Sequence, residues 1–402
     1  MRILRRKVDP RVEKATAAHA AGDFVRAREL AADVVADGDP SLEAVRGLAE
    51  LEYLLGDYDA AEPLLRRVAE NAGRNVELRV DAEVALALVY LQTNRFAAAR
   101  GLFAGLEGGI DLPLWELMKS FGGEEPYRIE WGGESKAVLP FTQTTTWELP
   151  CVRIELNGLE VDARIDTGGE LLTLSPDVAE ALEVEAVTGA EGVFAAGARG
   201  EIGYGRVDTV RLGPLTVRAV PVAVMALERP VIGTGFLRQF LATVDYPVRR
   251  LVLRARSSRL PEGGAEVPFA LAASHLILVS GSLDGREGQT FIVDSGLEDE
   301  GGASVALPRA TLDALGIPAP ALTEEIGESG AGSLSLRFGR FPLRQVGVGP
   351  LVQHDPSGLF GIFPDLWTEN GGITIQGILS HGFLRRYAWT LDFERMTMTF
   401  GT

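Results

Sequence analysis

The spacing of hydrophobic residues changes along the chain and divides it into a helical and a β-rich part. Up to about residue 108, apolar residues recur at helical spacing in a sequence rich in Ala, Leu, Glu and Arg. From Cys151 onward, apolar and polar residues mostly alternate, as in residues 152–156, which is typical of half-buried strands. Residues 109–148, between these parts, combine glycines and prolines with large aromatic residues. We therefore expect an all-α domain over residues 1–108, a packed connector over 109–148, and a mostly-β remainder.

A short pattern recurs within the helical part. The string Gly22-Asp23-Phe24 returns as Gly56-Asp57-Tyr58, 34 residues later (56 − 22), and more loosely as Asn94-Arg95-Phe96. In each copy an alanine follows the aromatic residue by three positions, at Ala27, Ala61 and Ala99. This period resembles that of tetratricopeptide (TPR) repeats, whose paired helices pack closely through small residues. The resemblance implies a concave face for a protein partner, although a helical bundle that only caps the other domain accounts for the pattern equally well.

Two apolar runs in the β-rich part end in an aspartate, a small hydroxyl residue and a glycine. They read Ile165-Asp166-Thr167-Gly168 and Val293-Asp294-Ser295-Gly296. Such a string presents a carboxylate on a tight loop, in which the hydroxyl holds the loop and glycine allows close backbone approach. Two copies predict a pair of carboxylates that meet across a pseudo-two-fold axis.

The repeat extends well beyond these triplets. Gly-Phe-Leu-Arg begins at Gly235 and again at Gly382, and in both copies an aspartate follows the glycine by ten residues, at Asp245 and Asp392. The same residues in the same order and at the same spacing, twice in one chain, indicate an internal duplication. We expect two lobes, over residues 149–258 and 259–402.

Together these motifs resemble the aspartic proteases of the pepsin and retropepsin type, most of all bacterial retropepsin-like proteins with two lobes in one chain. The resemblance spans residues 149–402 and implies that Asp166 and Asp294 are catalytic. It also implies that the following hydroxyl residues cross-link the two loops and that two later glycines pack beside them. The supporting residues would be Thr167, Gly168, Ser295, Gly296, Gly233 and Gly377.

Two further segments bear on how a substrate would be covered. Tyr204 lies in a glycine-flanked segment suited to a mobile hairpin, similar to the flap tyrosine of the family, although an ordinary sheet tyrosine accounts for it equally well. In the second lobe, residues 327–332 occupy the corresponding interval and contain no aromatic residue. The acidic run from Glu298 to Glu300 departs from the family pattern, and we expect it on a solvated loop; pointing inward, it would raise the pKa of Asp294.

Composition narrows the possible partners and compartment. The net charge of −17 argues against nucleic acid and against an anionic membrane surface. Cys151 is the only cysteine, which excludes an intramolecular disulfide. The first residues are basic but lead into no apolar segment of a signal peptide, and no stretch approaches the ~20 apolar residues that span a bilayer. We expect a cytoplasmic protein.

The paired aspartates predict a specific chemistry. Two nearby carboxyl groups share one proton, so that one can take a proton from water while the other polarises a carbonyl group, without a metal or cofactor. The four histidines show no zinc-ligand spacing, and no nucleophile elbow or phosphate-binding loop occurs. We predict an aspartic endopeptidase, a hydrolase that cleaves a peptide or protein substrate in the cleft between its lobes. The alternatives are a catalytically weak or inactive copy that binds extended peptides while the repeats recruit a partner, and a scaffold built mainly on the repeats.

Overall fold

The computed structural model of this chain consists of two compact units, Met1–Asp111 and Leu112–Thr402. It describes residues 10–36, 41–103, 113–143, 145, 148–260, 263–272, 275–326, 336–363, 369–370 and 373–401. The first unit is helical and the second is mostly β, which confirms the helical and β-rich parts that the hydrophobic pattern predicts. Residues 113–143 of the expected connector belong to the second unit.

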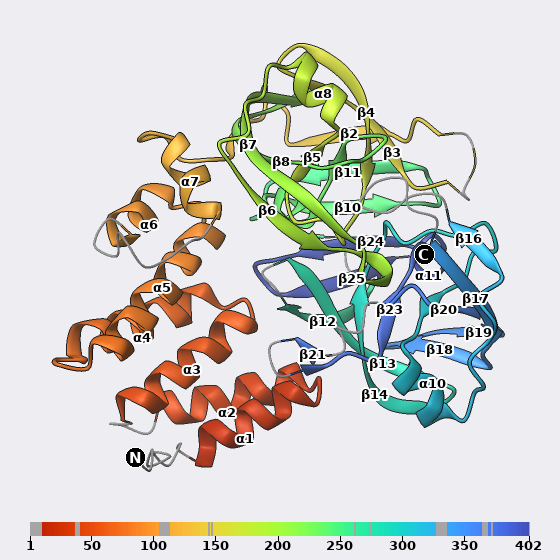
Figure 1. The fold of residues 1–402 in the computed structure, drawn as a ribbon, viewed down its shortest axis with the longest axis horizontal. Helices are drawn as coiled ribbons and strands as arrows, with labels where there is room; N and C mark the ends of the chain where they lie inside the picture. The colour runs from red at the N-terminus through yellow and green to blue at the C-terminus, as the bar shows by residue number, and fades with distance from the viewer. Residues whose placement is uncertain are drawn as a thin grey trace. The chain divides into compact units, whose positions relative to one another are not determined.

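The described part of the first unit forms three successive helix pairs (Figure 1). The helices are α1 (Pro10–Ala20), α2 (Phe24–Ala36), α3 (Leu42–Leu54), α4 (Tyr58–Asn71), α5 (Val76–Gln92) and α6 (Phe96–Phe103).

The 34-residue pattern occupies the same place in each helix pair. Its first position lies at the turn in the left-handed conformation, with φ of 76° at Gly22, 76° at Gly56 and 62° at Asn94. Its aromatic residue opens the second helix of each pair and is buried, and the alanine three positions later is fully buried. A side chain larger than Ala would separate the paired helices at this point. The repeated sequence therefore specifies the same turn and the same close helix packing in each pair.

The second unit contains two halves, which we define as residues 113–260 and 263–401. The elements of the first half are α7 (Pro113–Ser120), β1 (Arg128–Glu130), β2 (Lys136–Pro140), β3 (Cys151–Leu156), β4 (Leu159–Ile165), β5 (Leu172–Leu174), α8 (Pro176–Ala181), β6 (Thr188–Val193), β7 (Arg199–Leu212), β8 (Leu215–Val224), β9 (Val231–Ile232), α9 (Thr234–Leu237), β10 (Leu241–Asp245) and β11 (Arg250–Arg254). A single 3₁₀ turn, Ala195–Gly197, lies between β6 and β7.

The second half begins with β12 and ends with β25. Its elements are β12 (Ala265–Ala272), β13 (Leu276–Leu283), β14 (Arg286–Val293), β15 (Val305–Ala306), α10 (Arg309–Leu315), β16 (Glu324–Ile326), β17 (Leu336–Pro342), β18 (Gln345–Val348), β19 (Leu351–His354), β20 (Ser357–Phe360), β21 (Glu369–Asn370), β22 (Ile373–Thr374), β23 (Gly377–Leu379), α11 (His381–Leu384), β24 (Ala388–Asp392) and β25 (Thr397–Gly401).

Strand pairing is duplicated between the halves. In the first half, β4 runs parallel to β9, β9 is antiparallel to β5, and β5 is parallel to β8. In the second half, β14, β23, β15 and β20 repeat the same three relations in the same order. Each half therefore places the end of an apolar strand, β4 or β14, beside a second short strand that leads into a short helix.

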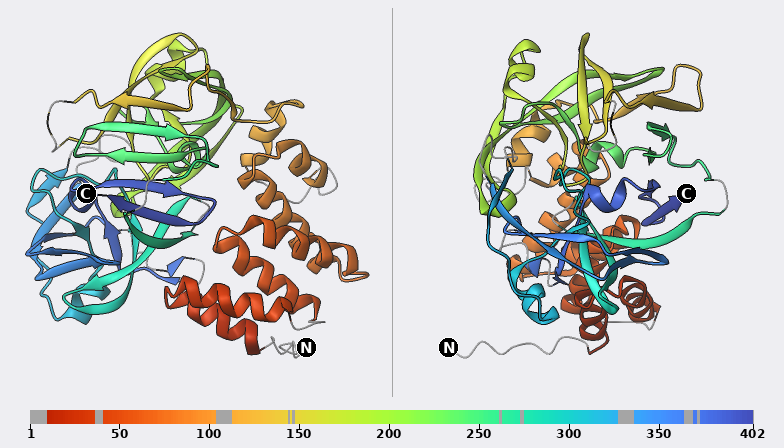
Figure 2. Two further views of the ribbon diagram at one scale, coloured as in Figure 1. Left: turned by 180° about the vertical axis from the view of Figure 1, so that it is seen from behind. Right: turned by 90° about the vertical axis from the view of Figure 1, so that its right-hand side faces the viewer.

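A continuous sheet joins the halves. The antiparallel pair β10 and β24 connects them, and the green and dark blue strands lie next to each other in the left view of Figure 2. The hydroxyls of Thr243 and Thr390, which face each other in this pair, are 2.7 Å apart. One hydrophobic core runs through both halves and includes Phe236 and Phe383 of the two Gly-Phe-Leu-Arg strings, both fully buried. Burial of each such ring stabilises the fold by roughly 1.5–3 kcal/mol.

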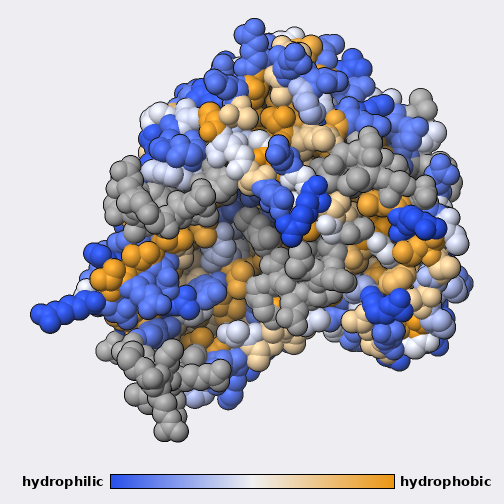
Figure 3. Space-filling model, in the orientation of Figure 1, coloured by the Kyte–Doolittle hydropathy of each residue, from blue (hydrophilic) through white to orange (hydrophobic). Residues whose placement is uncertain are grey.

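The face drawn in Figure 3 carries both hydrophilic and hydrophobic residues. The large hydrophobic side chains that are exposed are Val25, Val76, Val138, Leu159, Val187, Val248, Leu322 and Val352. They are spread over both units, and exposed single apolar residues are ordinary on folded proteins. Among the described residues, none of the helices has the length and apolar character that crossing a membrane requires.

Candidate active site

Asp166 and Asp294 occupy equivalent positions at the ends of β4 and β14. The backbone N–H of Asp166 donates to the carbonyl of Ile232 at 3.1 Å, and that of Asp294 donates to the carbonyl of Leu379 at 2.9 Å. These bonds continue the parallel pairing of each strand by one residue. The apolar run before each aspartate is buried in the core, so the strand carries the carboxyl group to the edge of the core and the chain turns there.

Thr167 and Ser295 join the two loops. The N–H of Thr167 donates to Ser295 Oγ at 3.0 Å, and the N–H of Ser295 donates to Thr167 Oγ1 at 3.0 Å. The hydroxyl of Thr167 donates to the carbonyl of Val293 at 2.7 Å, and that of Ser295 to the carbonyl of Ile165 at 3.1 Å. Both side chains are fully buried. The N–H and the hydroxyl of each residue thus bond to the opposite half, which holds the two aspartate loops at a set separation.

Each glycine of the triplets faces the aspartate of the other half. A Cβ added to Gly168 would stand 2.9 Å from Asp294 Oδ1, and one added to Gly296 would overlap the carboxyl group of Asp166. The glycine N–H groups bond to the aspartate of their own loop, at 2.8 Å from Gly168 to Asp166 and 2.9 Å from Gly296 to Asp294. The absence of side chains here allows the two carboxyl groups to approach each other.

The surroundings raise the pKa of both aspartates. Burial raises the pKa of Asp166, whereas the N–H of Gly168 and a hydrogen bond with the Asp294 carboxyl oppose this rise. Burial also raises the pKa of Asp294 well above its ordinary value, and the charge of Asp166 and their mutual hydrogen bond raise it further. Burial and the mutual repulsion of the two charges thus favour a state in which the pair shares one proton, and the apparent pKa values belong to the pair.

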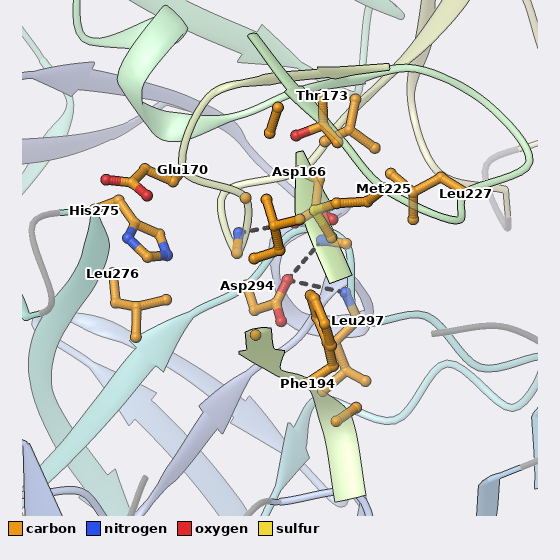
Figure 4. A pocket seen from close by; sticks show the side chains of 18 of the residues that line it. Asp166, Glu170, Thr173, Phe194, Met225, Leu227, His275, Leu276, Asp294 and Leu297 are labelled. Carbon is orange, nitrogen blue, oxygen red and sulfur yellow. Dashed lines mark hydrogen bonds between the residues drawn. The ribbon is translucent and has the colours of Figure 1, made fainter. Parts of the chain in front are cut away.

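Both carboxyl groups open into a cavity of about 420 Å³ (Figure 4). Residues of both halves line it, and the hairpin of β6 and β7 contributes Val193, Phe194 and Tyr204. The larger apolar residues of its wall are Leu171, Ile202, Met225, Leu227, Val231, Leu276, Leu297, Leu336, Ile362 and Ile378. A mainly apolar cavity with two convergent carboxyl groups suits an extended chain with hydrophobic side chains.

Tyr204 lies in the wall of this cavity, within strand β7. Its main chain pairs with Thr188 and Ala223, and burial followed by the charge of Glu170 raises the pKa of its hydroxyl to about 12. The tip of the same hairpin carries Phe194, which lines the same cavity as Leu297 and Asp294 (Figure 4). The aromatic residue at the hairpin tip is thus Phe194, whereas Tyr204 lines the base. The corresponding segment of the second half, residues 327–332, lies outside the described residues.

Gly233 and Gly377 do not occupy equivalent places. Gly233 packs against the first loop, since a Cβ there would lie 2.6 Å from the carbonyl oxygen of Gly169. Gly377 lies in β23 and pairs with Phe291 of β14, and a Cβ on it would meet Leu307 and the carbonyl of Ala306 instead.

The assignment of Gly377 beside the second aspartate loop is therefore wrong. The residue in that place is Ser380, whose N–H donates to the carbonyl of Ser304 at 3.0 Å. The Gly-Phe-Leu-Arg repeat indicates this equivalence. Ser380 lies two residues before Gly382, just as Gly233 lies two residues before Gly235.

The acidic run after the second triplet is only partly solvated. Glu298 lines the cavity, and burial raises its pKa. Asp299 is buried, forms an ion pair with Arg340 and accepts the N–H of Ala303 at 2.7 Å. Only Glu300 is exposed, so the expected solvated loop is found for one of the three acids.

Phe194, Glu170 and His275 also line the cavity, and the sequence motifs do not assign them to the site. Glu170 follows the first triplet by two positions, and that proximity is a signal for it. Phe194 and His275 carry no such signal, because only the fold brings the hairpin and the start of β13 over the aspartates.

A family model described as "Aspartyl protease" matches residues 152–237. This segment includes the first triplet and Gly233 and ends before the second triplet. Among curated proteins, no relative matches this chain.

Two solved structures are distantly similar. A retropepsin-like aspartic protease from Rickettsia conorii is 14% identical with a TM-score of 0.24, and the match covers 32% of this chain and 94% of that one. An aspartic proteinase from Irpex lacteus is 14% identical with a TM-score of 0.40, and the match covers 66% of this chain and 97% of that one.

Proposed function

We propose that this chain is an aspartic endopeptidase in which Asp166 and Asp294 activate a water molecule to hydrolyse a peptide bond. The observation that carries this proposal is the pair of loops that Thr167 and Ser295 cross-link, which hold two hydrogen-bonded carboxyl groups at the floor of one cavity. The family match to the segment that contains Asp166 supports it. We also propose that the two halves act as the two lobes of this family.

A pair that shares one proton has one ionised and one protonated carboxyl, and we assign the ionised role to Asp166. The ionised carboxylate of Asp166 accepts a proton from the water, whose oxygen attacks the scissile carbonyl carbon. The protonated Asp294 donates a hydrogen bond and then its proton to the carbonyl oxygen, which gives a tetrahedral diol. Collapse of the diol returns a proton to Asp294, the proton on Asp166 moves to the leaving nitrogen, and the C–N bond breaks. Both carboxyl groups then return to their starting protonation state.

Cleavage of a peptide library over acidic to neutral pH, with and without a statine-type inhibitor, tests this proposal. We expect activity to fall on both sides of an optimum, because one carboxyl must be ionised and the other protonated. Asp166→Asn and Asp294→Asn should each abolish turnover and leave the fold and peptide binding intact. Wild-type protein that binds extended peptides but cleaves none at any pH would contradict the proposal and indicate an inactive peptide-binding copy.

For the helical unit, we propose that the three pairs are TPR-like repeats that bind a protein partner. The shared left-handed turn and buried alanine of the pairs support this. A cytoplasmic location remains a prediction from the single cysteine.

A further inference from the structure

The two halves differ at the first residue of the short helix behind each aspartate loop. The internal repeat aligns Thr234, which begins α9, with His381, which begins α11. Both contact the loop through the backbone: Thr234 N–H donates to the carbonyl of Gly169 at 2.8 Å, and His381 N–H donates to the carbonyl of Leu297 at 3.0 Å. The main chain is therefore duplicated here, and only the side chains distinguish the halves.

The Thr234 side chain bonds within its own half, where its hydroxyl donates to the carbonyl of Thr167 at 2.8 Å. His381 instead contacts the other half. Its ring is 1% exposed, and its Nδ1 lies 3.2 Å from the hydroxyl of Tyr246, with the ring centroids 5.4 Å apart. The repeat aligns Tyr246 with Phe393, which has no hydroxyl. This cross-half pair thus exists behind the Asp294 loop and has no counterpart in the residues aligned with it behind the Asp166 loop.

A short series of contacts connects this pair to a dyad carboxyl. Leu297 accepts the N–H of His381 through its carbonyl and donates its own N–H to Asp294 Oδ1 at 3.1 Å. Tyr246 is itself held in place, since its ring packs at 5.9 Å from that of Phe141 and at 6.4 Å from that of Trp389. The fixed Tyr246 ring therefore positions His381, and His381 positions the residue whose N–H reaches Asp294.

We propose that Tyr246 and His381 are positioning residues that hold the Asp294 loop and thereby influence how Asp294 and Asp166 share their proton. This inference rests on the proposed peptidase function. A backbone N–H that donates to a carboxylate stabilises its ionised form. If Leu297 moves away, Asp294 loses part of that stabilisation and retains its proton to higher pH.

The surroundings of Tyr246 keep its hydroxyl protonated, so this side of its contact with His381 does not depend on pH in the working range. Burial raises the pKa of the Tyr246 hydroxyl, the charges of Glu298 and Asp166 raise it further, and that of Arg385 lowers it. The phenol thus keeps its proton throughout the acidic to neutral range in which the dyad would work.

Tyr246→Phe tests the proposal, because it removes the hydroxyl and keeps the ring. We expect kcat to fall by about 10-fold with KM unchanged, since the dyad is misplaced and the cavity wall is not. The alkaline limb of the pH profile should move up by about half a pH unit. Thr390→Val is the matched control, because it removes a different side-chain contact between the halves, that of the Thr390 hydroxyl with the Thr243 hydroxyl in the β10–β24 pair. It should leave kcat and both limbs unchanged.

Two substitutions of His381 separate hydrogen bonding from packing. His381→Asn keeps a polar group in the place of Nδ1 and should retain most of the wild-type kcat. His381→Leu removes it and should behave as Tyr246→Phe does. Equal losses of kcat in Tyr246→Phe and Thr390→Val, with unmoved pH limbs, would show a structural role alone and overturn the proposal.

A readout independent of turnover separates this inference from the proposed function. The carboxyl carbons of Asp166 and Asp294 can be titrated by NMR in ¹³C-aspartate-labelled wild type and Tyr246→Phe. We expect the higher of the two apparent pKa values to rise in the variant. Unchanged titration would overturn the positioning role even in an active enzyme, whereas a shift in a protein that cleaves nothing would overturn the peptidase proposal alone.

Discussion

At the scale of single residues, the site needs two positions without a side chain as well as two that carry a hydroxyl group. Gly168 and Gly296 leave space into which the opposite carboxyl group extends. The hydroxyls of Thr167 and Ser295 have a different role: each accepts an N–H from the opposite loop and donates to a carbonyl there. Residue size and hydrogen-bonding capacity together determine the separation of the two carboxyls.

Gly296→Ala should therefore lower kcat/KM by about 100-fold or more, because the added methyl displaces Asp166 from the pair. Gly123→Ala is the control, since a Cβ there meets nothing within 4 Å and should leave activity unchanged. The measurement is kcat/KM on a peptide that the wild type cleaves, with thermal unfolding recorded for both variants. Wild-type activity in Gly296→Ala would show that the close approach of the loops is not needed.

At the scale of elements, the helix pairs are built around small buried residues, yet α3 also buries an acid. Glu52 is 5% exposed. Burial, followed by the charge of Asp57, raises its pKa to about 7, whereas Arg28 lowers it. The folded helices therefore bind a proton at Glu52 more tightly than the unfolded chain does. The stability that this protonation contributes is complete below the ordinary pKa of the carboxyl and is lost as the pH rises through about 7.

Glu52→Gln should stabilise the helical unit at pH 8 by roughly 1–3 kcal/mol and change little at pH 4. The amide is neutral at both pH values, so it avoids the cost of a buried charge. Urea unfolding followed by circular dichroism at 222 nm measures this, because the helical unit gives most of that signal. The control is Glu50→Gln, an exposed acid beside Arg46. An equal gain at pH 4 and pH 8 would contradict the buried-charge explanation.

At the scale of the whole molecule, both aspartates and the residues that cross-link them belong to one chain. The contacts between Thr167 and Ser295 and between β10 and β24 join its two halves. The dyad thus needs no second copy. Mixing Asp166→Asn protein with Asp294→Asn protein should give no cleavage beyond that of each variant alone. Recovered activity in the mixture would show that the dyad forms between chains.

The second unit has its own continuous core, so it should fold without the helical unit. A chain that lacks residues 1–111 should keep a β-type circular dichroism spectrum and cooperative unfolding. Its kcat on short peptides should lie within about threefold of the full chain, because the dyad and its cavity belong to the second unit. An unfolded remainder would mean that the two units share one folding transition.

Local patterns in the sequence determined the helical and β-rich parts, the duplication, and the two Asp-Thr/Ser-Gly loops. These features depend on periodicity and on backbone conformation, which neighbouring residues control. Only the tertiary structure decided which side chains surround the carboxyls: Phe194 from a hairpin tip, His275 from the residue before β13, and Ser380 in the place assigned to Gly377. The burial of Asp299 and the contact between Tyr246 and His381 belong to the same class. Each depends on the packing of segments far apart in the chain, and residue order alone does not specify that packing.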